Sequence, residues 1–192
     1  MFIHDWKKDI FTIPNMLSLF RIVLIPAYIT IYLHATQPRE YLIAGSILAL
    51  SCFTDLIDGK IARRFNMISN FGKILDPIAD KLTQFTLTWC LSIKYPVMRF
   101  VLTLFVFKEG FQAVVGIIHL RNGKMLPGAL MAGKICTTVL FVSLIILVLI
   151  PNMKHEIVSI IAAIDTGFLF FAFMHYFFAY FGKNPRLEDL QT

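Results

Sequence analysis

Apolar residues run in long stretches along nearly the whole chain, and short polar segments separate them. Each stretch is close to the roughly 20 residues that an α-helix needs to cross the hydrocarbon core of a bilayer. The pattern predicts an all-α integral membrane protein with six transmembrane helices, at about residues 14–34, 41–58, 72–93, 97–120, 129–150 and 156–181. We found no internal repeat, so residues 1–192 are expected to form a single membrane-embedded domain.

The two ends of the chain are more polar than these stretches. Residues 1–13 mix Trp6 and other apolar residues with lysines and aspartates, which predicts a helix lying in the membrane interface; a loose terminus is the alternative. This segment lacks a short apolar core followed by a small-residue cleavage site, so no cleavable signal is expected. Residues 182–192 are expected to form a cytoplasmic tail.

The composition supports a membrane protein, because 57% of the residues are hydrophobic and only 16% are charged. The net charge of +6 does not indicate nucleic-acid binding, since the basic residues lie in short connections rather than along one helix or arm. Most of them follow the second and fourth stretches or lie near the two termini: Lys7, Lys8, Lys60, Arg63, Arg64, Arg121, Lys124, Lys183 and Arg186. The positive-inside rule therefore puts both termini and these connections in the cytoplasm, in a multi-pass protein of the inner or plasma membrane.

The three cysteines, Cys52, Cys90 and Cys136, lie far apart in apolar surroundings and have no CxxC or CxxH spacing. We interpret them as reduced packing residues rather than as zinc ligands or disulfide partners.

Carboxylates occur where the second and third stretches meet. Asp55 and Asp58 are three residues apart, and Asp76 and Asp80 are four apart, so each pair lies on one face of its helix. Two antiparallel helices can bring the pairs together. Acids at membrane depth cost several kcal/mol unless they are paired, hydrated or bound to metal, so they are candidates for function.

Four clustered carboxylates repel one another unless positive charge is supplied, and divalent cations can supply it. Oxygen ligands without nearby cysteine or several histidines favour Mg²⁺ or Mn²⁺, which commonly bind phosphate groups as well. The sequence therefore predicts a divalent-metal site for a phosphorylated substrate. Gly59 and Ala62 leave space for a ligand beside Asp58, and Arg63 is placed to bind a diphosphate with both arms of its guanidinium group.

These residues form a pattern that resembles the signature of the CDP-alcohol phosphotransferase family. The pattern is Asp55-x-x-Asp58-Gly59-x-x-Ala62-Arg63, then eight residues, then Gly72-x-x-x-Asp76-x-x-x-Asp80, and all eight fixed positions match. A second segment, Ile13-Pro14-Asn15-Met16-Leu17-Ser18-x-x-Arg21, is similar to the opening of bacterial phosphatidylglycerophosphate synthases and related cardiolipin synthases. The six-helix expectation agrees with the fold of this family.

The resemblance implies roles for individual residues. Asp55, Asp58 and Asp76 would bind metal, with two ions per site. The residues around CDP-diacylglycerol would be Asp55, Asp58, Gly59, Ala62, Arg63 and Gly72. Asp80 would be the catalytic base that takes the proton of the acceptor hydroxyl, or instead a further metal ligand. The reaction would be a direct displacement of CMP in phospholipid biosynthesis, carried out by a homodimer.

The choice of acceptor alcohol depends on basic residues outside the acidic motif. Lys108, Arg121, Lys124 and Lys134 are the cations available for a phosphorylated acceptor. Lys108-Glu109 stands where phosphatidylglycerophosphate synthases carry Arg-Glu, and Cys136 replaces the second lysine of their Gly-Lys-x-Lys-Thr segment. We expect glycerol 3-phosphate as acceptor, with phosphatidylglycerol as the next choice and inositol phosphates or other alcohols after it. In the structural alternative, Glu109 neutralises Lys108 and Lys134 extends to the headgroups.

Other interpretations remain open at this stage. A cation transporter would also hold buried carboxylates, but it has no use for an arginine that repels its ion. A structural adaptor would bear the cost of four acids without using them. Arg21 is expected to pair with a buried acid such as Asp165 or to meet the substrate, and His175 is expected to pack beside aromatic rings.

Overall fold

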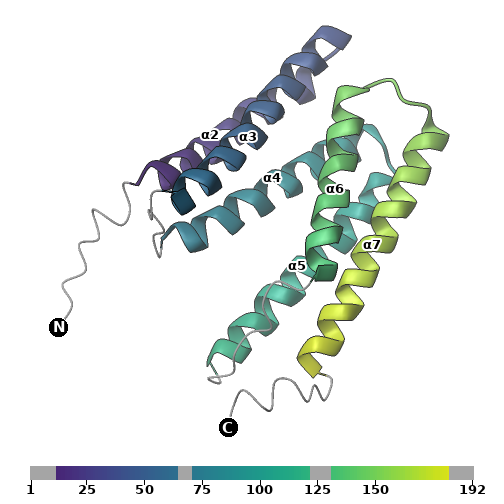
Figure 1. Cartoon of the computed structure of the whole chain (residues 1–192). Helices are drawn as coiled ribbons and strands as arrows, with labels where there is room; N and C mark the ends of the chain where they lie inside the picture. Colours follow the sequence, from purple (N-terminus) through teal and green to yellow (C-terminus); the bar gives the residue numbers. More distant parts are fainter. Residues whose placement is uncertain (1–11, 65–70, 122–130, 182–192) are drawn as a thin grey trace. The chain divides into compact units, whose positions relative to one another are not determined.

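The structure is a computed structural model that describes residues 12–64, 71–121 and 131–181. For residues 55–63, 73, 74, 119 and 120 it describes the helical backbone but not the side chains. Helices make up nearly all of the described residues (Figure 1). They are α2 (Ile13–His34), α3 (Pro38–Arg64), α4 (Gly72–Lys94), α5 (Met98–Arg121), α6 (Met131–Leu149) and α7 (His155–Phe181). The predicted interfacial segment 1–13 lies almost wholly outside this part of the chain, as does the tail 182–192.

Each of the six predicted stretches is a helix, so the helical fold class is confirmed for the described residues. In this part of the chain, four segments are long and apolar enough to cross a membrane: Ile13–His34, Met98–Ile118, Met131–Leu149 and His155–Phe181. The other two helices, α3 and α4, contain the four aspartates of the motif together with several basic residues, which lower their mean hydropathy. Membrane crossing is thus supported for four of the six predicted spans.

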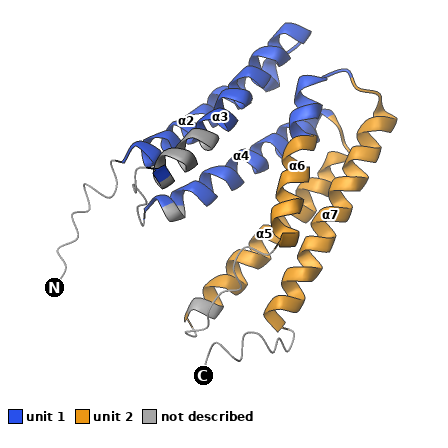
Figure 2. Cartoon of the chain, in the orientation of Figure 1, with its two compact units in different colours: residues 1–94, 144–152 blue, residues 95–143, 153–192 orange. Residues whose placement is uncertain are grey.

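The chain divides into two compact units, which Figure 2 shows in different colours. The first consists of residues 1–94 and 144–152, and the second consists of residues 95–143 and 153–192. No pattern in the sequence indicated this division, and the division does not test the expectation of a single domain.

In the first unit, α2 packs against both α3 and α4. The buried residues of α2 lie on one face of the helix, and three of them are polar: Asn15, Ser18 and Arg21. Apolar residues such as Met16 and Val23 are exposed on the rest of the helix surface. This arrangement is the reverse of a soluble amphipathic helix, and it suits a helix whose outer surface meets lipid. It places a row of polar groups against the two acid-bearing helices.

Aromatic rings join the three helices of this unit at the end away from the connection between α3 and α4. Tyr28 and Tyr32 of α2 are stacked, with ring centroids 5.5 Å apart. Tyr32 meets Tyr41 of α3 edge to face at 5.4 Å, and the Nζ atom of Lys94 at the end of α4 lies 3.8 Å from the centroid of the Tyr41 ring. Such aromatic and cation–π contacts stabilise by about 0.5–1.5 kcal/mol each. They fix where the far ends of α2, α3 and α4 meet.

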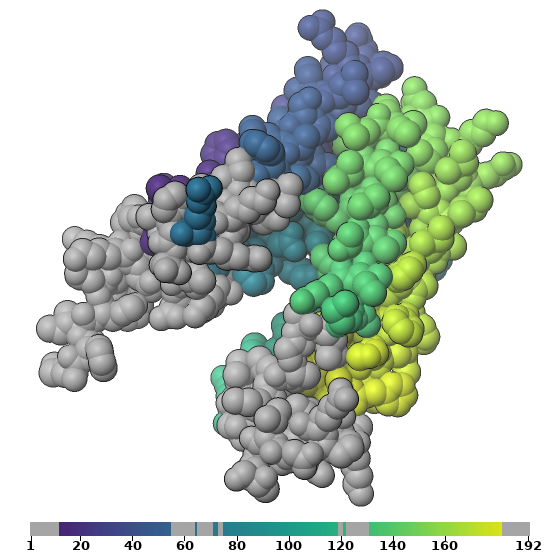
Figure 3. All heavy atoms as spheres, viewed as in Figure 1, coloured from purple at the N-terminus to yellow at the C-terminus, as the bar shows by residue number. Residues whose placement is uncertain are grey.

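In the second unit, α5 and α7 pack along each other. The ring of Phe111 on α5 lies 5.1 Å from that of Phe173 and 6.1 Å from that of Phe177, both on α7. The buried positions of α7 follow a helical spacing of three and four residues: Val158, Ala162, Asp165, Leu169, Ala172 and Tyr176. Residues 131–143 of α6 also belong to this unit and lie against α7 (Figure 3).

Candidate active site

The described part of the candidate site begins with two carboxylates on the first turns of α4. Asp76 and Asp80 are each partly exposed, and Pro77 follows Asp76 inside the helix. The Oδ1 atom of Asp76 accepts a hydrogen bond from the hydroxyl of Ser18 on α2. The Oδ2 atom of Asp80 lies 3.4 Å from Nε2 of Gln84, one turn further along α4, and Gln84 is only 1% exposed. Both acids therefore have a buried donor beside them and keep access to the surface.

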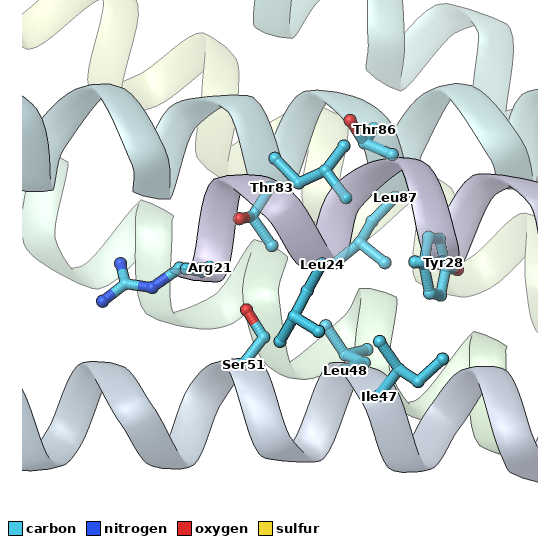
Figure 4. Close-up of a pocket in the computed structure, with 10 residues that line it drawn as sticks. Arg21, Leu24, Tyr28, Ile47, Leu48, Ser51, Thr83, Thr86 and Leu87 are labelled. Carbon is cyan, nitrogen blue, oxygen red and sulfur yellow. The ribbon is translucent and has the colours of Figure 1, made fainter. Parts of the chain in front are cut away.

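A narrow pocket lies between α2, α3 and α4 (Figure 4). Its walls are mostly apolar and include Leu24 and Leu87, and Tyr28 stands at one end. At the other end, the guanidinium group of Arg21 extends out of the pocket, on the side of the Ser51 and Thr83 hydroxyls (Figure 4). Arg21 is the one charged residue among the described residues that line this pocket, and we call the end at which it lies the polar end.

The polar end of the pocket faces the end of the unit that carries the acidic motif. α3 ends and α4 begins at the same end of the unit (Figure 1), so the two helices run in opposite directions. Along α3 the chain continues from Ser51 to positions 55 and 58, and along α4 it leads back from Thr83 to Asp80 and Asp76. Both predicted acid pairs therefore belong to the end of the helices toward which Arg21 extends.

The structure leaves part of the predicted site undescribed. Asp55, Asp58, Gly59, Ala62 and Arg63 lie on the described backbone of α3, but their side chains are outside the described residues. Gly72 is buried at the first residue of α4. Among the side chains that are described, no three acidic, histidine or cysteine groups gather as a metal site. Since two of the four predicted ligands are not among them, the metal site stays a prediction.

The candidate acceptor residues belong to the second unit, and they differ in how exposed they are. Lys108 on α5 is only 3% exposed, and its Nζ atom lies 2.6 Å from Oε1 of Glu109. The same Nζ atom lies 5.7 Å from the centroid of the Tyr176 ring on α7. This pairing agrees with the structural alternative for Lys108, in which its charge is neutralised by its neighbour. Arg121 and Lys134 are exposed, and Lys124 lies outside the described residues.

Gly133, the residue before Lys134, is in close contact with α7. A Cβ atom at this position would overlap the hydroxyl oxygen of Tyr176 and would lie 2.9 and 3.0 Å from two of its ring carbons. Glycine is therefore needed here for α6 to approach α7. Tyr176 consequently lies between Lys108 and the Gly133-Lys134 pair.

Sequence reasoning missed three residues of these sites. Ser18 lies within the motif at the start of α2, but the motif does not show which side chain it meets. The contact of Gln84 with Asp80 could have been predicted, because Gln84 lies one helical turn after Asp80. Nothing in the sequence singled out Tyr176, since it lies among the many aromatic residues of α7.

Three further residues that the sequence analysis singled out are described by the structure. Arg21 is buried in the first unit, and Asp165 is fully buried in the second. His175 is exposed, with its ring 6.3 Å from that of Phe171, as expected for a histidine beside aromatic residues.

Comparison with known proteins identifies the class to which this arrangement belongs. The sequence model of the CDP-alcohol phosphatidyltransferases matches residues 11–171, which include all of α2 to α6 and the complete acidic motif. The chain therefore belongs to the CDP-alcohol phosphatidyltransferase family.

The curated relatives that the chain matches are named either as glycerol-3-phosphate phosphatidyltransferases or as cardiolipin synthases. The chain is 30% identical over 161 residues to the CDP-diacylglycerol–glycerol-3-phosphate 3-phosphatidyltransferase of Bacillus subtilis, a match covering 78% of this chain and 82% of that protein. A protein of the same name from Rickettsia bellii is 41% identical over 70 residues, covering 36% of this chain and 38% of that protein. The cardiolipin synthase (CMP-forming) of Streptomyces coelicolor is 35% identical over 134 residues, covering 67% of this chain and 60% of that protein.

The chain spans less than two thirds of the length of several relatives that it matches, and only 35% of one from Drosophila melanogaster. Because the relatives are named for two different acceptors, their names identify the reaction class and leave the acceptor open.

Proposed function

We propose that this protein transfers a phosphatidyl group from CDP-diacylglycerol to an alcohol acceptor, with release of CMP, in a reaction that depends on Mg²⁺ or Mn²⁺. The observation that carries this proposal is the placement of Asp76 and Asp80. Both are partly exposed at the start of α4, each has a buried hydrogen-bond donor beside it, and both belong to a complete family motif.

The donor set suits a hard divalent cation. Carboxylate oxygens are the ligands that Mg²⁺ and Mn²⁺ prefer, and the two described acids, Asp76 and Asp80, are both partly exposed. Asp55, Asp58 and Asp76 would hold two ions, with Asp80 beside them. When bound, the ions would neutralise the diphosphate and stabilise the charge that develops on the departing CMP.

The protein's own residues perform the remaining steps. Arg63 binds the diphosphate, and Gly59 and Ala62 leave it room beside α3. Asp80 accepts the proton of the acceptor hydroxyl while that oxygen forms a bond to the β-phosphorus. The bond between this phosphorus and the oxygen of CMP breaks in the same displacement, so no covalent enzyme intermediate is needed.

For the acceptor, we propose glycerol 3-phosphate. Lys134 supports this choice because it is exposed and free to meet a phosphate, and it follows a glycine whose place is fixed by Tyr176. Phosphatidylglycerol is the second candidate. The paired and buried state of Lys108, together with Cys136 in place of a second lysine, leaves less positive charge than a small phosphorylated acceptor favours.

We further propose the membrane arrangement in which this reaction takes place. All six helices cross the membrane, α3 and α4 with their acidic ends at the cytoplasmic surface. Both termini and the active site face the cytoplasm, where CMP is released, and the protein acts as a homodimer in the inner or plasma membrane.

The test is an assay with purified full-length protein in detergent. CDP-diacylglycerol and Mg²⁺ or Mn²⁺ are supplied with glycerol 3-phosphate, phosphatidylglycerol or inositol phosphate, and CMP and lipid product are measured. We expect product with glycerol 3-phosphate and none after chelation of the metal. Product with phosphatidylglycerol alone would make the protein a cardiolipin synthase. Absence of CMP with every acceptor, from folded protein that binds metal, would overturn the proposal and favour a transporter.

A further inference from the structure

Ser18 is a buried residue of α2 whose hydroxyl reaches another helix. It is 0% exposed, and its oxygen lies within hydrogen-bonding reach of Oδ1 of Asp76 on α4 and 3.1 Å from the carbonyl oxygen of Pro14. The contact with Asp76 joins positions 58 residues apart in the chain. A serine hydroxyl has one proton, so it can donate fully to only one of these oxygens.

The carboxylate is the stronger acceptor of the two. Hydrogen bonds to a charged oxygen are roughly twice as strong as those between neutral groups. In contrast, the hydroxyls of Thr83 and Thr88 on α4 are 2.9 and 2.8 Å from the carbonyl oxygen four residues earlier in their own helix. The usual role of a hydroxyl inside a helix is such a local bond. Ser18 has this local partner available and reaches Asp76 in addition.

Asp76 is at a position where the helix itself gives less support. Pro77 follows it inside α4 and provides no backbone N–H for the helical hydrogen bond to residue 73. A residue before proline is also disfavoured in the helical conformation. A hydrogen bond from α2 to the Asp76 side chain therefore supplies restraint that the α4 backbone lacks at this point.

We propose that Ser18 is a positioning residue for metal binding: by donating to Oδ1 of Asp76, its hydroxyl holds the carboxylate so that the other oxygen is presented to the divalent cation. This inference rests on the proposed function, which makes Asp76 a metal ligand. Partners that orient a metal-binding carboxylate typically change metal affinity by about 10- to 100-fold when they are removed.

The experiment measures the affinity of the purified full-length protein for Mn²⁺ in detergent, without any substrate. The concentration of free Mn²⁺ is read from its electron paramagnetic resonance spectrum. Ser18→Ala is expected to weaken Mn²⁺ binding by about 10- to 100-fold. Ser18→Thr keeps the hydroxyl and should recover most of the affinity. Ser46→Ala is the matched control, because Ser46 is an exposed serine of α3 whose hydroxyl lies 2.8 Å from the carbonyl oxygen of Leu42. It should bind Mn²⁺ like the unmodified protein.

Two further variants separate the possible failures. If Asp76→Asn retains full Mn²⁺ affinity, the ligand assignment in the proposed function is wrong. If Asp76→Asn loses affinity while Ser18→Ala binds normally, only the positioning role of Ser18 is refuted. Should Ser18→Ala fail to fold, Ser18→Cys offers a similar volume with a much weaker donor, and it should also bind Mn²⁺ less tightly. Equal losses in Ser18→Ala, Ser18→Thr and Ser46→Ala would likewise overturn the inference.

Discussion

At the level of single residues, the two described acids of the motif are held in different ways. Asp76 accepts its hydrogen bond from α2, whereas Asp80 has Gln84 of its own helix 3.4 Å away. An asparagine at position 80 has nearly the same shape as the aspartate, so the Asp80→Asn variant tests the chemical role of this residue with little change in side-chain volume.

We predict that Asp80→Asn lowers turnover by about 10²- to 10⁴-fold, because an amide cannot accept the proton of the attacking hydroxyl. Binding of CDP-diacylglycerol should persist, since the asparagine carbonyl still accepts a hydrogen bond from Gln84. The measurements are the turnover rate with saturating acceptor and the dissociation constant for CDP-diacylglycerol. Glu156→Gln, which alters an exposed acid of α7, is the control. If binding falls as far as turnover, Asp80 acts as a metal ligand rather than as the base.

The sequence predicted the positions of the acids because helical spacing alone places Asp76 and Asp80 on one face of α4. It did not predict the Ser18–Asp76 bond, because that bond depends on how α2 and α4 pack. The ion pair between Lys108 and Glu109 was foreseen as an alternative, since neighbouring opposite charges in an apolar helix favour pairing.

At the level of helices, the boundaries of α2 and α7 agree closely with the hydrophobic pattern, because both are apolar along nearly their whole length. The pattern was less accurate for α3, which begins at Pro38 and extends to Arg64 beyond the predicted stretch 41–58. Charged residues follow the apolar part of this helix, so hydropathy ends before the helix does. The close contact of α6 with α7 at Gly133 had no sequence signal apart from the glycine itself.

Helix packing in the second unit gives a prediction on stability. Gly133→Ala should lower the free energy of unfolding by about 1–3 kcal/mol, because the new methyl group overlaps the rigid ring of Tyr176. Gly110→Ala on α5 is the matched control: apart from its own stretch of helix, no described atom lies within 4 Å of the added Cβ. It should be neutral or should stabilise by about 0.5–1 kcal/mol, since alanine favours helix more than glycine.

Thermal unfolding in detergent measures both glycine variants. Combining Gly133→Ala with Tyr176→Phe removes the closest overlapping atom and should restore part of the lost stability. Equal unfolding temperatures for Gly133→Ala and Gly110→Ala would show that α6 and α7 do not meet as closely as the structure indicates.

At the level of the whole molecule, the sequence identified the family and the helical membrane class from two motifs and the hydropathy pattern. It did not reveal the division into two units, because that depends on contacts between helices far apart in the chain. The orientation that we propose in the membrane rests on charge alone: basic residues gather after the second and fourth predicted spans.

This orientation predicts which residues a reagent can reach from outside the cell. In a variant lacking native cysteines, a cysteine at Asn152, in the connection between α6 and α7, should react with a membrane-impermeant maleimide on intact cells. A cysteine at Arg64, at the end of α3, should react only after the membrane is opened. Both residues are exposed in the structure, so access to the reagent depends on the side of the membrane. The opposite labelling pattern would place the proposed active site outside the cytoplasm.

The two faces of α2 also bear on how this protein can change over evolutionary time. Exposed residues such as Met16 and Val23 lie on the side of α2 that would meet lipid chains. Lipid chains are fluid and adapt to the shape of a side chain, so one apolar residue can replace another there at little cost in stability. Asn15, Ser18 and Arg21 contact fixed neighbours, and a replacement there must satisfy them or leave a buried polar group without its bond. We therefore expect accepted substitutions in this helix to follow a period near 3.6 residues, with many on the outward side and few on the buried side.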